Sequence, residues 1–365
     1  MKKILALLLC LALVFGLAAC GEKKEAEPAP APAEEQKEDT LPTVVILGTG
    51  GTIAGTGEAG KTTGYSAGEL DVQSLIDGVP GLDKLATLKG EQVLNTASDN
   101  VTAKDWIVLA KRINELAKDD SIAGFVITHG TDTLEETADF LDLTVKPDQP
   151  VICVGAMRPA TATSADGPMN LYQSVALART PEAKGRGVMV VFSDGIYAAR
   201  QVTKVTTYRT DAFNGRDFGA LGYMVDDKAY FYNKSEKPNT VDTPFDVSEL
   251  EDLPKVGIAY FHIDAELDVL EHYLDSYEGV IVAGAGNGSM STLWHNRIKE
   301  RVDGGDGVIV VRAGRMDNGI VTEYATNPQT IAGNNLNPQK ARILLSLALT
   351  VTKDREQIRE YFATY

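Results

Sequence analysis

Cysteine is scarce in this 365-residue chain, which contains only Cys10, Cys20 and Cys153. Cys10 lies in a leucine-rich N-terminal run, and Cys153 lies in the apolar run 151–154, where we expect a core residue. This placement excludes an intramolecular disulfide framework. Cys20 closes the N-terminal run and therefore requires a separate explanation.

Positive charge is also in short supply, since 35 basic residues face 51 acidic ones and the formal net charge is −16 at pH 7. Such a surface argues against nucleic acid or anionic lipid head groups as partners. The four histidines have no metal-ligand spacing, so we expect no metal site. They are His129, His262, His272 and His295.

A long hydrophobic run occurs only at the start, where residues 4–19 follow two lysines. It is typical of a signal peptide and too short to predict a membrane span. The ending Leu-Ala-Ala-Cys20 resembles the lipobox of bacterial lipoproteins, in which the cysteine carries lipid. An ordinary signal peptide with an unrelated cysteine is the alternative.

The first 42 residues therefore predict a signal peptide over 1–19 and a lipidated Cys20 at the start of a disordered tether over 20–42. The tether is rich in Glu, Lys, Ala and Pro and cannot bury enough apolar surface to fold. We expect an exported protein on the periplasmic or cell-surface side of the envelope, in contact with the membrane only through its lipid.

After the tether, short β-branched runs alternate with segments of helical spacing, such as 105–118 and 134–143. This alternation predicts an α/β fold with mostly parallel sheets. We expect a larger N-terminal domain over 43–232, a Pro-containing linker over 233–254 and a smaller α/β domain over 255–365. The expected strands cover residues 43–47, 125–128, 151–154, 188–192, 256–260, 280–283 and 308–311.

Residues 55–62 match the phosphate-loop pattern letter for letter, but we reject a nucleotide site there. That motif needs a strand directly before it and a helix directly after it. The expected strand ends near Leu47, and Gly64 and Gly68 interrupt the position where a helix would begin. We interpret the segment as a mobile Gly/Thr loop.

Two threonine-bearing loops follow strands of the expected sheet. The first carries Thr52 in Gly-Gly-Thr, and the second carries Thr131 and Asp132 just before a helix. Open α/β sheets bind ligands at the carboxyl ends of their strands, where glycines offer free N–H donors. Alone, the first could be only a turn and the second only a capping box at 133–136. Together they can supply a nucleophile, its base and an oxyanion site.

The strings LGTGGTIAG (47–55) and GFVITHGTDTLEET (124–137) resemble the two signature segments of the bacterial type II L-asparaginases. The similarity covers nearly all of the chain after the tether and keeps the family's order. It continues through VGAMRP (154–159), SADGPMNLY (164–172), DTPFDVSEL (242–250), LPKVGI (253–258), GAGNGS (284–289) and LNPQKARILLSLALT (336–350).

This resemblance implies that the chain hydrolyses L-asparagine to L-aspartate and ammonia, with Thr52 as nucleophile and Tyr65 activating it from a mobile loop. We expect this chemistry to require no metal and no organic cofactor. The resemblance also implies a second catalytic threonine, Thr131, linked to Lys204 and Asp132. For Lys204 and Asp132 the alternative is a structural ion pair.

The resemblance further implies that Ser98 binds the substrate α-carboxylate and that Asp132 meets its ammonium group. It implies a homo-oligomer, at least a dimer with a tetramer expected, in which Asn287 and Glu323 reach a neighbour's active site. For Asn287 the alternative is a Gly-rich turn after a strand.

The sequence departs from the family in three places. Asp99 stands where many members carry Gln or Glu at a substrate-binding position, so the preference for asparagine over L-glutamine stays open. A disulfide known in some relatives is replaced by Ala117 and Pro147. Residues 320–335 are shorter than usual and lack an acidic run. Two other functions stay open. Asp99 leaves open a mixed glutaminase-asparaginase, and the lipobox, the tether and two α/β lobes would also fit a lipid-anchored solute-binding protein.

Overall fold

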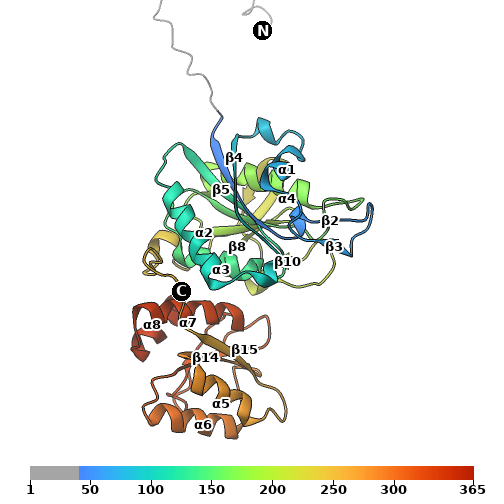
Figure 1. Cartoon of the computed structure of the whole chain (residues 1–365). Helices are drawn as coiled ribbons and strands as arrows, with labels where there is room; N and C mark the ends of the chain where they lie inside the picture. Colours follow the sequence, from blue (N-terminus) through green and yellow to red (C-terminus); the bar gives the residue numbers. More distant parts are fainter. Residues whose placement is uncertain (1–40) are drawn as a thin grey trace, which may run out of the picture. The chain divides into compact units, whose positions relative to one another are not determined.

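An eight-stranded sheet forms the N-terminal part of the computed structural model, which describes residues 41–365 (Figure 1). The strand order is β12-β11-β8-β7-β6-β5-β1-β4, and the strands from β7 to β4 are parallel. The bounds are β1 (Thr43–Gly50), β4 (Thr87–Thr96), β5 (Ile122–Thr128), β6 (Val151–Val154), β7 (Val188–Phe192), β8 (Gly195–Ala198), β11 (Gly222–Val225) and β12 (Lys228–Phe231).

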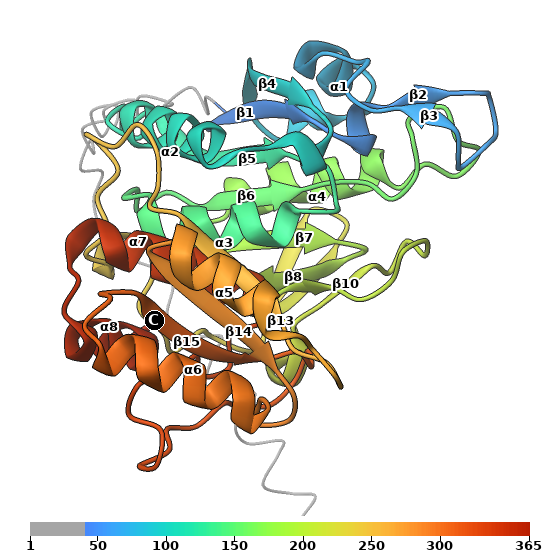
Figure 2. The same cartoon turned by 60° about the horizontal axis from the view of Figure 1, so that its bottom comes forward.

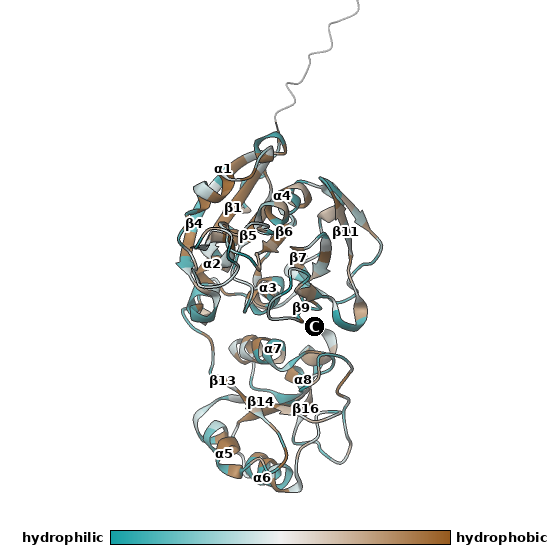
Figure 3. Cartoon of the chain, turned by 90° about the vertical axis from the view of Figure 1, so that its right-hand side faces the viewer, coloured by the Kyte–Doolittle hydropathy of each residue, from teal (hydrophilic) through white to brown (hydrophobic). Residues whose placement is uncertain are grey.

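Helices cover both faces of this sheet. Successive residues of a strand point to opposite sides, and apolar residues at both positions give each face a core to be covered. Val44 and Ile46 of β1 share a core with α1 (Val72–Asp77) and α4 (Gly167–Ala178). Val45 and Leu47 share the other core with α2 (Ala103–Leu116) and α3 (Leu134–Thr144). Hydrophobic residues accordingly concentrate in the central strands (Figure 3).

A second, parallel sheet of four strands follows in the order β13-β14-β15-β16 (Figure 2). Helices α5 and α6 pack on one face, and α7 and α8 pack on the other. Helix α7 also packs against α3. The bounds are β13 (Val256–Tyr260), β14 (Gly279–Gly284), β15 (Ile309–Gly314), β16 (Ile331–Ala332), α5 (Leu267–Ser276), α6 (Thr292–Asp303), α7 (Pro338–Val351) and α8 (Arg355–Thr364).

The predicted α/β class with two mostly parallel sheets is confirmed, and every expected strand is present, three of them with the expected bounds. The predicted linker over 233–254 contains a 3-10 turn at Thr240–Asp242. Its Phe245 and Val247 are buried in the core, so the segment is a packed connection. The predicted signal peptide, Cys20 and nearly all of the predicted tether lie outside the described residues. Within 41–365, no helix has the length and apolar character needed to cross a membrane.

Candidate functional site

The loop after β1 touches the loop after β5. Both strands are parallel neighbours, so their carboxyl ends lie at the same edge of the sheet. Gly51 has a φ of +80°, and a Cβ at this position would lie 2.3 Å from the amide nitrogen of Gly130. A side chain at Gly51 would therefore separate the two threonine-bearing loops.

Ser98 joins the same edge from the third loop, which follows β4 and begins with the 3-10 turn Ser98–Asn100. The hydroxyl of Thr133 donates to the Ser98 carbonyl at 2.7 Å. The capping-box alternative is therefore wrong, because this hydroxyl does not cap its own helix. Ser98 is buried next to Gly130, whereas the adjacent Asp99 is exposed.

Thr52 is the first residue of a 3-10 turn, Thr52–Ala54, directly after Gly51. Its Oγ1 lies 2.8 Å from the hydroxyl of Tyr65, and Thr52 is buried. Tyr65 belongs to strand β3 (Tyr65–Ser66), which pairs with β2 (Thr56–Gly57) in an antiparallel hairpin. This hairpin therefore holds a phenol against a shielded threonine hydroxyl.

Residues 55–62 lie mostly in that hairpin, so the rejected phosphate loop is indeed not formed. One of the reasons for rejecting it was wrong, since β1 continues to Gly50 instead of ending near Leu47. One of the expected free glycine N–H donors is also occupied, because the Gly51 N–H donates to the Thr96 carbonyl at 3.0 Å. That N–H is not free to bind an oxyanion.

Thr131, Asp132 and Lys204 meet through the ammonium group of the lysine. Lys204 Nζ donates to Thr131 Oγ1 at 2.8 Å and to Asp132 Oδ1 at 2.6 Å. Thr131 is buried, the Lys204 side chain is 16% exposed and the Asp132 side chain is 73% exposed. The lysine therefore links a shielded hydroxyl to a carboxylate that is open to solvent.

His129 fixes the shape of the turn that carries Thr131. Its Nδ1 lies 2.8 Å from the Gly130 carbonyl, and its Nε2 lies 2.9 Å from the hydroxyl of Thr137. Burial lowers the pKa of this imidazole, which favours its neutral form. Among residues 41–365, no group of three or more His, Cys, Asp or Glu side chains is arranged to hold a metal ion.

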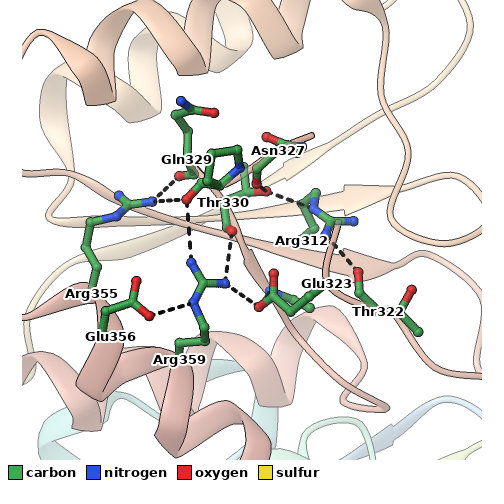
Figure 4. Close-up of polar contacts among 11 residues, drawn as sticks. Arg312, Thr322, Glu323, Asn327, Gln329, Thr330, Arg355, Glu356 and Arg359 are labelled. Carbon is green, nitrogen blue, oxygen red and sulfur yellow. Dashed lines mark hydrogen bonds and ion pairs between the residues drawn. The ribbon is translucent and has the colours of Figure 1, made fainter. Parts of the chain in front are cut away.

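Asn287 and Glu323 lie together, and their hydrogen-bond partners within the described residues all belong to the C-terminal half. The Asn287 side chain donates to Thr322 Oγ1 at 2.8 Å and accepts from the Thr322 N–H at 2.7 Å. Glu323 accepts from the Ala332 N–H at 2.9 Å and pairs with Arg359 of α8 (Figure 4). In residues 41–365, neither side chain is hydrogen-bonded to Thr52 or Thr131.

Sequence reasoning missed Glu135, a buried carboxylate in the first turn of α3. It borders a pocket of about 470 Å³ together with Asp132 and Lys204. Asp317 and Gln339, from the C-terminal half, line the same pocket. The only local signal was the Glu-Glu pair within the second signature, which does not distinguish Glu135 from its neighbour.

Comparison with known proteins gives two family matches. Residues 43–237 match "Asparaginase, N-terminal", and residues 255–362 match "Glutaminase/Asparaginase C-terminal domain". L-asparaginase 2 of Bacillus subtilis is 45% identical over 381 residues and covers 100% of both chains.

The "Probable L-asparaginase periplasmic" of Haemophilus influenzae is 44% identical over 89% of this chain and 93% of its own. Other relatives are named glutaminase-asparaginase. The crystal structure of the "Probable Cytoplasmic L-asparaginase" of Campylobacter jejuni matches with a TM-score of 0.85 and 47% identity. It covers 88% of this chain and 99% of that one.

Proposed function

This chain belongs to the asparaginase family and is an asparagine amidohydrolase, and we propose that the hydroxyl of Thr52 attacks the substrate amide. The observation that carries this proposal is the 2.8 Å contact between Thr52 Oγ1 and the Tyr65 hydroxyl at the carboxyl end of β1. The tyrosine oxygen is placed to accept the threonine proton as the new C–O bond forms, while the phenol's own proton passes to the amide nitrogen, which then leaves as ammonia.

The reaction then runs in two halves. Attack of the Thr52 oxygen on the side-chain carbonyl gives a tetrahedral oxyanion, whose collapse breaks the C–N bond and releases ammonia once the nitrogen is protonated. Water then hydrolyses the threonine ester to aspartate and restores the hydroxyl. The N–H of Thr52, at the start of its 3-10 turn, has no partner within that turn and is a candidate oxyanion donor.

Thr131, Asp132 and Lys204 form the second part of the proposed machinery. The contact between Lys204 Nζ and Thr131 Oγ1 polarises a hydroxyl that faces the same sheet edge as Thr52. A water molecule activated there can attack the ester. The exposed Asp132 carboxylate remains open to the α-ammonium group of the substrate.

Substrate recognition is proposed for the loop after β4. Ser98 lies next to Gly130, where its hydroxyl can donate to the α-carboxylate of asparagine. Asp99 follows on the exposed side and is proposed to bind the amino end of the substrate. Its side chain is shorter than Gln or Glu, which leaves room for the additional methylene of glutamine.

Ammonia release from asparagine and glutamine, measured side by side, tests the substrate assignment. We expect a higher specificity constant for asparagine, together with some remaining activity on glutamine. The glutamine side chain is longer by one methylene, and this difference changes binding by only about 1–3 kcal/mol. An equal or higher constant for glutamine would identify a mixed glutaminase-asparaginase. Thr52→Ala should lower turnover by several orders of magnitude while the protein stays folded, and near-normal turnover would reject the proposed nucleophile.

The active site is also proposed to be shared between subunits of a homo-oligomer. Asn287 and Glu323 lie in one hydrogen-bonded group of the C-terminal half, where each could reach a neighbour's substrate. Glu323 would have to exchange its pairing with Arg359 for the new contact, whereas Asn287 would have to release Thr322.

Export and lipid anchoring at Cys20 complete the proposal. The N-terminal charged and hydrophobic pattern with its lipobox supports them, and the match to L-asparaginase 2 of Bacillus subtilis extends over the whole chain, this segment included. Among the relatives, one is named periplasmic and another cytoplasmic. The solute-binding alternative has no support, because both halves of the chain match an enzyme family.

A further inference from the structure

A buried carboxylate connects the backbone of Lys204 to the C-terminal half of the chain. Glu135 is 4% exposed and lies in the first turn of α3, four residues after Thr131. We propose that Glu135 is a positioning residue, which holds Lys204 at the distance its contact with Thr131 requires. The inference rests on the proposed role of Lys204.

The two oxygens of Glu135 face different partners. Oε2 accepts from the Lys204 N–H at 2.7 Å. Oε1 accepts from Gln339 Nε2 at 2.6 Å and from Asn337 Nδ2 at 3.2 Å. Asn337 is itself fixed as the N-cap of α7, where its oxygen accepts from the Lys340 N–H. Because donors engage it from both sides, the carboxylate cannot rotate without breaking a hydrogen bond in a buried place.

Lys204 depends on such a support because its own strand is short. Within residues 41–365, strand β9 (Thr203–Lys204) pairs with β10 (Phe213–Asn214) alone, outside the eight-stranded sheet. Glu135 ties this strand to the same loop and helix that carry Thr131 and Asp132. The 2.8 Å contact between Lys204 Nζ and Thr131 Oγ1 is therefore set at both ends by residues 131–135.

Helix α3 offers a matched carboxylate with no such role. Asp142 is also buried, and its Oδ1 accepts from the backbone N–H of Val188 at 2.7 Å. Val188 begins β7 and has no contact with Lys204 among the described hydrogen bonds. Asp142→Asn therefore repeats the chemical change of Glu135→Gln on the same helix without touching the proposed support.

The test measures kcat and KM for asparagine in the full-length protein carrying Glu135→Gln. The amide that replaces the carboxylate has one accepting oxygen, which can face either the Lys204 N–H or the side chains of Asn337 and Gln339. One of these two sides therefore loses its acceptor. We expect kcat to fall about 10- to 100-fold with KM changed less than about threefold, as a small misplacement of a reacting group predicts. Asp142→Asn should keep kcat within about twofold. A parental kcat in Glu135→Gln, or an equal loss in Asp142→Asn, overturns the inference.

A double-mutant cycle separates this inference from the function on which it rests. If Glu135 acts through Lys204, then Glu135→Gln should cost almost nothing more in a Lys204→Met background. Additive losses overturn the positioning role while leaving the role of Lys204 intact. A near-parental kcat in Lys204→Met alone rejects the proposed function of the lysine, and the inference with it.

A second variant keeps the inference testable if Glu135→Gln does not fold. Gln339→Leu removes the 2.6 Å donor from the α7 side and leaves the Glu135 carboxylate in place. We expect kcat to fall about three- to tenfold at unchanged KM, because Oε1 of Glu135 then keeps only the longer contact of 3.2 Å with Asn337 Nδ2. An unchanged kcat in this variant overturns the inference.

Discussion

The hydroxyls of Thr52 and Tyr65 lie 2.8 Å apart, although the two residues belong to different elements on either side of a hairpin loop. Thr52 is fixed by its 3-10 turn at the sheet edge, whereas Tyr65 is carried by the two-stranded hairpin of β2 and β3. Any motion of this hairpin changes the environment of the proposed nucleophile. In the proposed mechanism, closure of the hairpin and transfer of the Thr52 proton would both depend on this one contact.

Tyr65→Phe removes the hydroxyl and keeps the ring. We expect kcat for asparagine to fall about 100- to 10,000-fold, the range for losing a general acid–base group. Steady-state ammonia release measures this change. Tyr208→Phe is the control, since Tyr208 is exposed and its hydroxyl contacts Thr62 of the same hairpin loop at 2.5 Å. Equal losses in both variants would assign the effect to loop anchoring and not to the Thr52 contact.

The buried Asp142 makes stability depend on pH. Burial raises its pKa from 3.8 to about 7, and the nearby Asp139 adds to this rise. Between these two values the unfolded chain releases the proton that the folded chain retains, so stability falls as pH increases from about 4 to about 7. Above and below that window the contribution of this group is constant.

Asp142→Asn should therefore flatten the dependence of stability on pH. The amide oxygen can still accept from the Val188 N–H, so the native contact remains. Urea unfolding at pH 5 and pH 8 measures the free energy of unfolding under both conditions. We expect a smaller loss of stability toward pH 8 in the variant, and an equal or larger loss would contradict the raised pKa.

Continuous apolar runs made the buried strands predictable. β6 and β7 are buried along their entire lengths and occur at the expected bounds. The edge strand β4 escaped prediction because none of its residues is fully buried and its sequence mixes Gly, Gln and Glu with apolar residues. Ser98 was still found, since the family resemblance supplied it without the strand.

Glu135 escaped prediction for a different physical reason. Its partners Lys204 and Gln339 lie 69 and 204 residues away along the chain, and the fold alone brings them together. Local sequence reports helix caps and apolar faces, but a buried carboxylate between two halves of a chain leaves no periodic signal. The packing of Phe245 in the expected linker was missed for the same reason.

The contacts of Lys340, a buried residue of α7, predict its contribution to the free energy of unfolding. It is fully buried, and its Nζ donates to the carbonyls of Ala199 and Val202 at 2.6 Å each. Lys340→Met leaves both carbonyls without their donor and should destabilise the protein by about 3 kcal/mol in urea unfolding. Lys353→Met is the control, because Lys353 forms an exposed pair with Glu278 and should cost less than about 1 kcal/mol.

The proposed lipidation of Cys20 predicts that the protein is attached to a membrane. Mass spectrometry of protein from its native membrane should find an acylated cysteine at the mature N-terminus, because a lipobox would place cleavage directly before it. Cys20→Ser should shift the protein out of the membrane fraction, while ammonia release by the purified protein stays unchanged. An unmodified N-terminus at another residue excludes lipidation.

Complementation tests whether each active site uses residues from two subunits. Thr52 lies at the edge of the large sheet, whereas Asn287 follows β14 of the small one. If the sites are shared, a mixed dimer of Thr52→Ala and Asn287→Ala chains contains one site with both defects and one site with neither. Co-refolding the two inactive chains should therefore give more activity than the sum of the parents.

The control for this mixture is Thr322→Val, which removes the hydroxyl that Asn287 contacts at 2.8 Å but keeps the amide itself. If Asn287 acts only through its own loop, Thr322→Val should reproduce much of the Asn287→Ala loss. Mixing Asn287→Ala with Thr52→Ala should then restore nothing, because every chain would carry its own defect into its own site. That pair of results would reject the shared site, whereas recovered activity with a mild Thr322→Val variant requires Asn287 to act on the neighbouring subunit.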